Sequence, residues 1–184
     1  MPELPEVEIV ARRLSAALAG GEVESAFAPG MNVMKTFDPP LDSLAGRELT
    51  GVRRIGKMPV VEFGDLALLV HLMSAGRLRV HDKRASLKDR ASRVLIRLTD
   101  GRELRLREMG TKQRAWAKLL PADAVAADEM VATLGPDAWP PLKRASPVAP
   151  LASAARREAS AQTARTPAPL ETSSAIATVA GVAP

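Results

Sequence analysis

A switch in hydrophobic period near residue 20 constrains the fold of this 184-residue chain more than any other feature. Before the switch, apolar residues recur at helical spacing from Val7 to Leu18, shortly after Pro5. After it, apolar and polar residues alternate as far as about Leu119, which is the pattern of strands. The sequence therefore predicts one helix of about fifteen residues, ended at Gly20-Gly21, and then a series of strands.

Two turn signals predict how these strands pair. Asp100-Gly101 separates two alternating apolar runs, the strongest short-range signal for a β-hairpin, and Gly64-Asp65 separates another two. Many short strands in series are typical of a sandwich or barrel. We expect a mainly β fold with helices: the N-terminal helix, a two-sheet antiparallel β-sandwich, and a short closing helix within residues 122–134.

Composition divides the chain at about residue 140. Residues 1–140 have the pattern of one domain, whereas residues 141–184 are mostly Ala, Pro, Ser and Thr, with no aromatic residue and two acids. Such a segment buries too little apolar surface to offset its ordering entropy, so we expect a disordered tail. Its composition fits a natural linker and also fits out-of-frame translation of a GC-rich gene, which we favour.

Charge leaves two interpretations open. The net charge is +5, and residues 77–118 carry fourteen Lys/Arg against five Asp/Glu. This segment attracts a polyanion if its charges share one face, or it forms the solvated faces of strands.

The residues that are missing exclude several classes of protein. Without cysteine there is no disulfide and no thiolate metal site, and His71 and His81 alone are weak grounds for zinc. No signal peptide and no transmembrane run is visible, so we expect a cytoplasmic protein, a monomer, without a membrane partner.

The N-terminus carries a reactive group if Met1 is removed. The secondary amine of Pro2 then becomes the chain terminus and can form a Schiff base with an electrophilic carbon. Glu3 lies beside it as a proton donor, and Glu6 lies one helical turn further on. The alternative is an acidic helix start opened by Pro5, a pattern that many helices share.

Three motifs in order resemble one family of enzymes. The octet Met1–Glu8 is similar, residue for residue, to the opening of the formamidopyrimidine-DNA glycosylase/endonuclease VIII family. Gly56-Lys57 stands where that family carries a lysine on a strand turn, and the stretch from His71 to Gly76 resembles its His-Leu-Gly-Met-Ser-Gly motif. The resemblance covers about the first 140 residues, the family's N-terminal catalytic domain.

The resemblance implies a base-excision repair glycosylase with lyase chemistry, acting on damaged or abasic DNA. Pro2 attacks C1′ of the damaged nucleotide, Glu3 handles protons during ring opening and β/δ-elimination, and Glu6 positions the nucleophile. Lys57 joins this catalytic group, and Lys57 and His71 hold the flanking phosphates. Without the resemblance, Lys57 is a solvated turn residue and His71 a half-buried strand histidine.

Two departures from the family concern base flipping. The methionine that fills the gap left by the flipped base stands fourth in the family motif, where this chain has Ser74, with Met73 one residue earlier. Residues 107–112 replace the family's Asp-Pro-Arg-Arg-Phe-Gly, so its wedge residues have no clear equivalents.

A third departure concerns the second half of the family's proteins. The helix–two-turn–helix unit and the four-cysteine zinc finger have no counterpart in this sequence, so we expect no metal cofactor. Three hypotheses remain open: a glycosylase that is weak or inactive on duplex lesions, a catalytically dead basic DNA-binding module, and a non-functional fragment.

Overall fold

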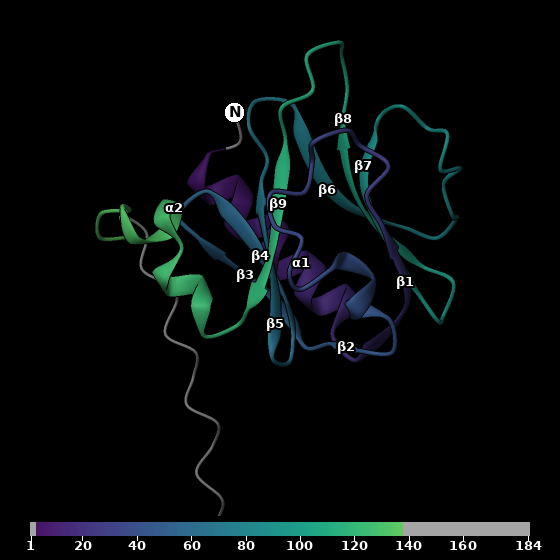
Figure 1. Ribbon diagram of the computed structural model, residues 1–184, viewed down its shortest axis with the longest axis horizontal. Helices are drawn as coiled ribbons and strands as arrows, with labels where there is room; N and C mark the ends of the chain where they lie inside the picture. The colour runs from purple at the N-terminus through teal and green to yellow at the C-terminus, as the bar shows by residue number, and fades with distance from the viewer. Residues whose placement is uncertain (1–2, 138–184) are drawn as a thin grey trace, which may run out of the picture. The chain divides into compact units, whose positions relative to one another are not determined.

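The computed structural model describes residues 3–137, and the chain divides into two units, Met1–Pro140 and Pro141–Pro184. The second unit, where we expect the tail, lies outside the described residues, and so does Pro2. The elements below all belong to the first unit (Figure 1).

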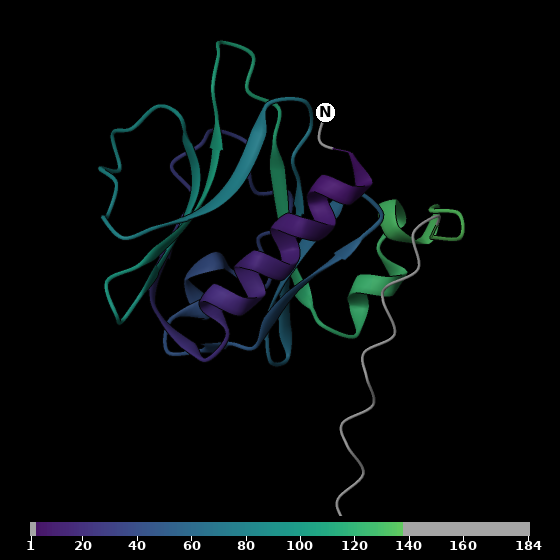
Figure 2. The same ribbon diagram turned by 180° about the vertical axis from the view of Figure 1, so that it is seen from behind.

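Helix α1 spans Leu4–Leu18 and confirms the expected fifteen-residue helix. Its buried side chains recur at helical spacing and are Val7, Ala11, Leu14 and Leu18. Ala17, an apolar residue at the same helical spacing, is exposed. Figure 2 shows the helix lying across the back of the strands. The backbone leaves the helix through Gly20, whose φ of 84° is in the left-handed region that favours glycine.

Two antiparallel sheets follow, as predicted. The five-stranded sheet has the order β2-β1-β7-β8-β6, and its strands are β1 Gly21–Phe27, β2 Glu48–Leu49, β6 Gly76–His81, β7 Ser92–Leu98 and β8 Glu103–Glu108. The four-stranded sheet has the order β3-β4-β5-β9, and its strands are β3 Gly51–Ile55, β4 Met58–Phe63, β5 Leu66–His71 and β9 Trp116–Pro121. A 3-10 helix, η1, spans Leu41–Leu44.

The core lies between the sheets and under α1. It is built from aliphatic side chains of both inner sheet faces and of the helix, with Phe63 as its largest member. Both predicted hairpins are present: Gly64 turns β4 into β5, and Gly101 turns β7 into β8, each at positive φ. None of the helices within residues 3–137 is long and apolar enough to cross a membrane.

In place of the one closing helix expected within residues 122–134, the structure has two short helices. Residues 122–134 form a 3-10 helix η2, Ala124–Ala127, and a one-turn helix α2, Glu129–Ala132. Asp128 separates them because its backbone is extended (φ −59°, ψ 134°). Its carboxylate also accepts hydrogen bonds from the Met130 N–H and from Lys118 Nζ. The prediction of one helix was wrong because apolar spacing does not reveal this interruption.

Candidate active site

Three of the predicted site residues meet at the start of α1. Lys57 Nζ lies 2.9 Å from Glu3 Oε2 and donates a hydrogen bond to it. Glu6 Oε2 accepts a hydrogen bond from the Glu3 N–H at 3.2 Å, so Glu6 orients the backbone at the end of the chain. Pro2 directly precedes Glu3, but it lies outside the described residues.

The β3–β4 turn places Lys57 opposite the helix. Its first residue, Gly56, has a φ of 54°, a conformation that a side chain strains. A Cβ at Gly56 would also lie 3.1 Å from Leu134, so the turn packs closely against the segment after α2. The two strands pair up to Ile55 and Met58, which fixes the direction in which the turn projects.

The ion pair lowers the pKa of Glu3. The hydrogen bond from Lys57, together with its positive charge, holds the pKa of the Glu3 carboxyl below its ordinary value. Glu3 is therefore ionised near neutral pH. Both side chains are accessible to solvent, with exposed fractions of 68% for Glu3 and 37% for Lys57, so a ligand can separate them.

His71 ends β5 with its ring held on two sides. The ring stacks on Trp116 of the neighbouring strand, with centroids 5.1 Å apart and an interplanar angle of 18°. The Met73 N–H donates to His71 Nδ1 at 3.1 Å. Burial lowers the pKa of His71, so the ring is neutral near neutral pH. With Nδ1 accepting a hydrogen bond, Nε2 carries the proton and is available as a donor.

The turn after His71 holds Met73 and Ser74, the two candidates for filling the gap left by a flipped base, in different surroundings. Met73, at a φ of 48°, is half-buried, whereas Ser74 is exposed and its carbonyl accepts a weak hydrogen bond from Arg77. The turn closes at Gly76, whose N–H donates to the Leu72 carbonyl at 2.8 Å. A Cβ at Gly76 would lie 2.4 Å from that oxygen, so the close approach requires glycine.

One cavity of about 570 Å³ connects these elements. Its walls include Leu4 of α1, Lys57 of the β3–β4 turn, and His71 and Met73 of the β5–β6 turn, and Leu134 closes one side. The cavity thus brings His71 and Met73 next to Lys57, the partner of Glu3. Ser74 does not belong to its walls.

Sequence reasoning missed Arg54, which joins the parts of this site. Its side chain is 3% exposed, and Nε donates to Glu8 of α1 at 2.7 Å. One terminal nitrogen donates to Asp137 at 2.8 Å and lies 3.4 Å from the Gly56 carbonyl. Arg54 therefore ties the helix that carries Glu3 to the turn that carries Lys57. The only sequence signal is an arginine beside another arginine on a strand, which does not reveal which of the two is buried.

The basic segment is only partly a charged surface. Within the described residues, seven of its fourteen Lys/Arg pair with acids, and they are Arg84, Arg93, Arg97, Arg102, Arg105, Arg107 and Lys118. These seven cations share six acids, since Arg97 and Arg105 both pair with Glu103, so ion pairs compensate less than half of the segment's positive charge. Lys112 and Arg114, in the loop between β8 and β9, have no ion pair with any residue in 3–137.

A family model described as the formamidopyrimidine-DNA glycosylase N-terminal domain matches residues 1–114. The chain belongs to the formamidopyrimidine-DNA glycosylase family. This confirms the resemblance that the motifs at Met1, Lys57 and His71 suggested.

Curated relatives and solved structures agree with the family model. The formamidopyrimidine-DNA glycosylase of Cytobacillus firmus is 33% identical over 117 residues, covering 60% of this chain and 42% of that protein. That of Geobacter sulfurreducens is 32% identical over 143 residues, covering 77% and 51%. The chain thus spans about half or less of the length of these relatives.

The structural likeness covers the same part of the chain. The Lactococcus lactis enzyme, non-covalently bound to DNA that contains an AP site, matches with a TM-score of 0.65 and 27% identity, over 74% of this chain and 52% of that one. The same enzyme bound to DNA containing N7-benzyl-Fapy-dG matches with a TM-score of 0.61 and 26% identity.

Proposed function

We propose that this domain performs Schiff-base chemistry on abasic sites in DNA, with the amine of Pro2 as the nucleophile. The observation that carries the proposal is the convergence of Glu6 and Lys57 on Glu3, the residue that follows Pro2. Covalent geometry keeps the Cα atoms of Pro2 and Glu3 about 3.8 Å apart, so whatever reacts with the amine is next to this group. Membership in the family, and a relative bound to AP-site DNA, supply the substrate class.

The proposed reaction has three steps. The amine attacks C1′ of the ring-opened sugar, a C–N bond forms, and loss of water leaves an iminium ion. A base then removes a proton from C2′, and the C3′–O bond breaks with the 3′-phosphate as the leaving group. Water finally hydrolyses the iminium and restores the amine.

Glu3 is the proton carrier in these steps. Its carboxylate, ionised beside Lys57, accepts a proton from the attacking amine or from C2′. Once Glu3 has accepted that proton, it can give it up to the leaving hydroxyl, and movement of Lys57 to a phosphate raises the Glu3 pKa toward its ordinary value. Binding of DNA thus changes the proton affinity of the group beside the nucleophile.

Lys57 and His71 serve as phosphate contacts of different kinds. The Lys57 ammonium is a point charge on a flexible chain. His71, neutral and held by Trp116 and the Met73 N–H, offers one fixed N–H donor at Nε2. Both line one cavity, so they can hold phosphates on one strand near the reacting sugar.

Excision of a damaged base from a duplex is a more demanding reaction. We expect the domain to be weak or inactive in this reaction. It requires flipping of the nucleotide, which costs on the order of a few kcal/mol. Residues 107–112 offer no counterpart of the family's wedge residues. An abasic site needs no base to be expelled, so single-stranded abasic DNA at low salt is the substrate of choice.

Borohydride trapping with an abasic oligonucleotide tests the proposal. Reduction of the iminium should link the protein with Met1 removed to DNA, whereas Pro2→Gly and a form that retains Met1 should give at least tenfold less adduct, an order-of-magnitude expectation for loss of a nucleophile. Glu6→Gln serves as a milder variant because it keeps an acceptor for the Glu3 N–H. If correctly processed protein gives no adduct but still binds the oligonucleotide, the chain is a DNA-binding module and the lyase proposal is wrong.

A further inference from the structure

Phe37 is the one aromatic side chain within residues 3–137 that is exposed to solvent, with an exposed fraction of 81%. Phe63 is in the core, and the guanidinium of Arg97 lies over the Phe27 ring at 5.0 Å. A single exposed apolar side chain is ordinary on a protein surface. What distinguishes Phe37 is the way its segment is held and what surrounds it.

The segment before Phe37 is fixed to the edge of β9. Met34 forms a parallel bridge with Ala117, and Lys35 N–H donates to the Ala117 carbonyl at 2.9 Å. Thr36 exchanges two hydrogen bonds with the Leu119 backbone, at 2.8 and 2.9 Å. The ring is therefore presented to solvent by a segment whose backbone is anchored, which lowers the entropy cost of binding to it.

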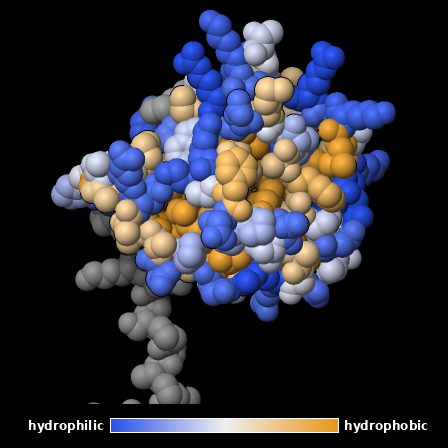
Figure 3. All heavy atoms as spheres, in the orientation of Figure 1, coloured by the Kyte–Doolittle hydropathy of each residue, from blue (hydrophilic) through white to orange (hydrophobic). Residues whose placement is uncertain are grey.

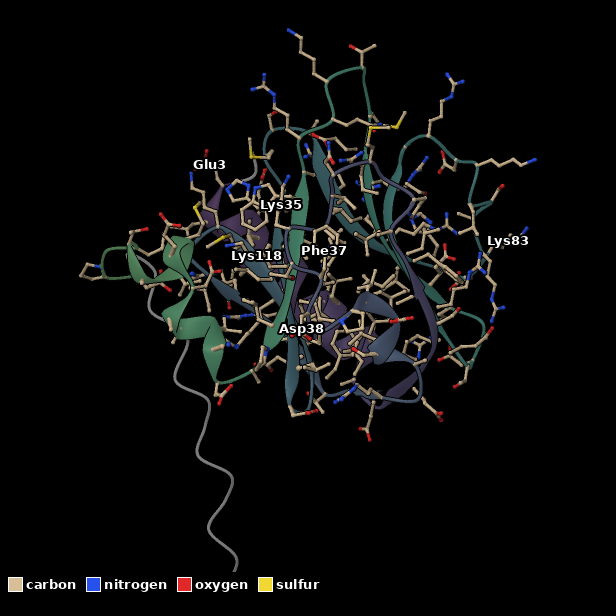
Figure 4. All side chains as sticks on the ribbon, in the orientation of Figure 1. Glu3, Lys35, Phe37, Asp38, Lys83 and Lys118 are labelled. Atoms are coloured by element: carbon tan, nitrogen blue, oxygen red, sulfur yellow. The ribbon has the colours of Figure 1, made fainter. Side chains whose placement is uncertain are left out.

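Lys35 and Phe37 flank Thr36, the residue that is hydrogen-bonded to the Leu119 backbone of β9. Both are exposed, while Val33 is buried. Figure 4 shows Lys35, Lys118 and Phe37 along the side of β9 that faces the viewer, with Glu3 beyond them at the upper left and Lys83 at the right-hand side of the domain. Figure 3 shows the same face, with apolar side chains at its centre and hydrophilic ones around them.

The charges on this face suit an anion. A cavity of about 470 Å³ lies beside Lys35 and is lined also by Arg93, Arg114 and Trp116, with no acidic residue among its described walls. Lys35 and Arg114 have no ion pair with any residue in 3–137. Lys118, in contrast, is held by Asp128 at 2.7 Å, so its charge is already compensated.

We propose that Phe37 and Lys35 form a platform for an unpaired nucleotide of the DNA strand that flanks the abasic site. The ring stacks on the base, and Lys35 and Arg114 contact the phosphates on one side of it. Asp38, exposed next to Phe37, repels phosphates on the other side, so the platform accommodates one base and not a continuing strand.

The platform is continuous with the active site. Trp116 lines the cavity beside Lys35 and also stacks on His71, which lines the cavity of the Glu3–Lys57 pair. A strand held at His71 therefore meets Lys35 across one indole ring, and Phe37 lies two residues further along the anchored segment. The inference rests on the proposed function in so far as DNA is the partner, and it adds a preference for DNA with an unpaired flank.

Fluorescence anisotropy with the full chain tests this preference. The probes are a blunt duplex with a tetrahydrofuran abasic analogue, which cannot form a Schiff base, and the same duplex with unpaired flanks on either side. The unpaired flank should raise affinity by about tenfold, since stacking on an aromatic residue has that order of effect. Phe37→Ala should bind both probes equally, and Phe37→Trp should keep the preference.

Ile9→Ala is the matched control, because Ile9 is 50% exposed and lies on α1, at the opposite face. If Phe37→Ala retains the preference for DNA with unpaired flanks, or if Ile9→Ala loses it equally, the platform proposal is wrong. If Phe37→Ala instead dissociates a dimer in sedimentation, a second copy occupies the face, and the proposal is also wrong. Phe37→Ala should still give the borohydride adduct at saturating protein, so failure of the platform and failure of the lyase proposal are distinguishable.

Discussion

The outer face of the five-stranded sheet and the corner around Glu3 use the same residue types in opposite ways. On the sheet, Glu103 is fully buried and accepts hydrogen bonds from Arg105, from Arg97 at 3.0 Å and from the Ala85 N–H at 3.0 Å. At the corner, Lys57 and Glu3 form a single ion pair that solvent reaches from both sides.

The difference teaches that charge density does not by itself locate a binding site. The arginines around Glu103 also bond the Lys83 and Ala85 carbonyls, so they fasten the β6–β7 loop to the sheet. Those cations are already satisfied and have little to offer a phosphate. The corner holds fewer charges, but each can exchange its partner for a ligand.

The largest expected effect comes from removing the buried acid. Glu103→Ala leaves two guanidinium groups without their carboxylate, and breaking a buried pair of this kind costs about 3–5 kcal/mol of unfolding free energy. Urea denaturation measures it, with Glu103→Gln as a milder variant if the alanine variant does not fold. Lys57→Ala is the matched control at the corner and should leave stability unchanged, since its partner is solvated. Equal losses in the two variants would contradict the comparison.

The sequence predicted the architecture well because hydrophobic period and turn chemistry are local. The helix from Leu4 to Leu18 and the turns at Gly64 and Gly101 follow from neighbouring residues alone. The convergence of Glu3 with Lys57 was expected only through family resemblance, because fifty-four positions separate them.

Other features depend on tertiary contacts and gave no local signal. Nothing nearby in the sequence distinguishes the buried Arg54 from the half-exposed Arg53. The pairing of the basic segment, residues 77–118, also depends on tertiary contacts. Alternation of Arg and Leu predicts strands there, but it does not predict which arginines contact a buried acid.

A dependence of stability on pH should follow from Glu103 as well. Burial opposes its charged form, but the hydrogen bonds from Ala85, Arg105 and Arg97 outweigh this and hold its pKa below the ordinary value of 4.5. A depressed carboxyl pKa adds stability above the unfolded-state pKa, and this stability is lost as pH falls through the folded-state pKa. The slope is at most about 1.4 kcal/mol per pH unit for one proton.

Urea midpoints of wild type and Glu103→Gln, measured from neutral to acid pH, test this dependence. The difference in urea midpoint between the two proteins should become smaller as the pH falls below the ordinary pKa of a glutamate, because a protonated Glu103 resembles glutamine. Asp89 and Asp100, whose pKa values are also lowered, titrate in both proteins and cancel in the difference. A gap that stays constant down to the acid transition would show that Glu103 is not ionised in the folded protein.

The smallest expected effect separates the two proposed phosphate contacts, Lys57 and His71. Lys57→Ala should lower the slope of log affinity against log salt by at most about 0.9, the value for one phosphate contact. The change can be smaller, because Glu3 takes up a cation from solution when Lys57 leaves it for the DNA, and this offsets part of the cation release. His71→Ala should weaken binding but leave the slope unchanged, since burial lowers the His71 pKa and its Nε2 donates without charge. Anisotropy titrations with the tetrahydrofuran duplex at several salt concentrations near neutral pH measure both. A His71 variant that changes the slope as much as the Lys57 variant would mean that the ring binds DNA as a cation.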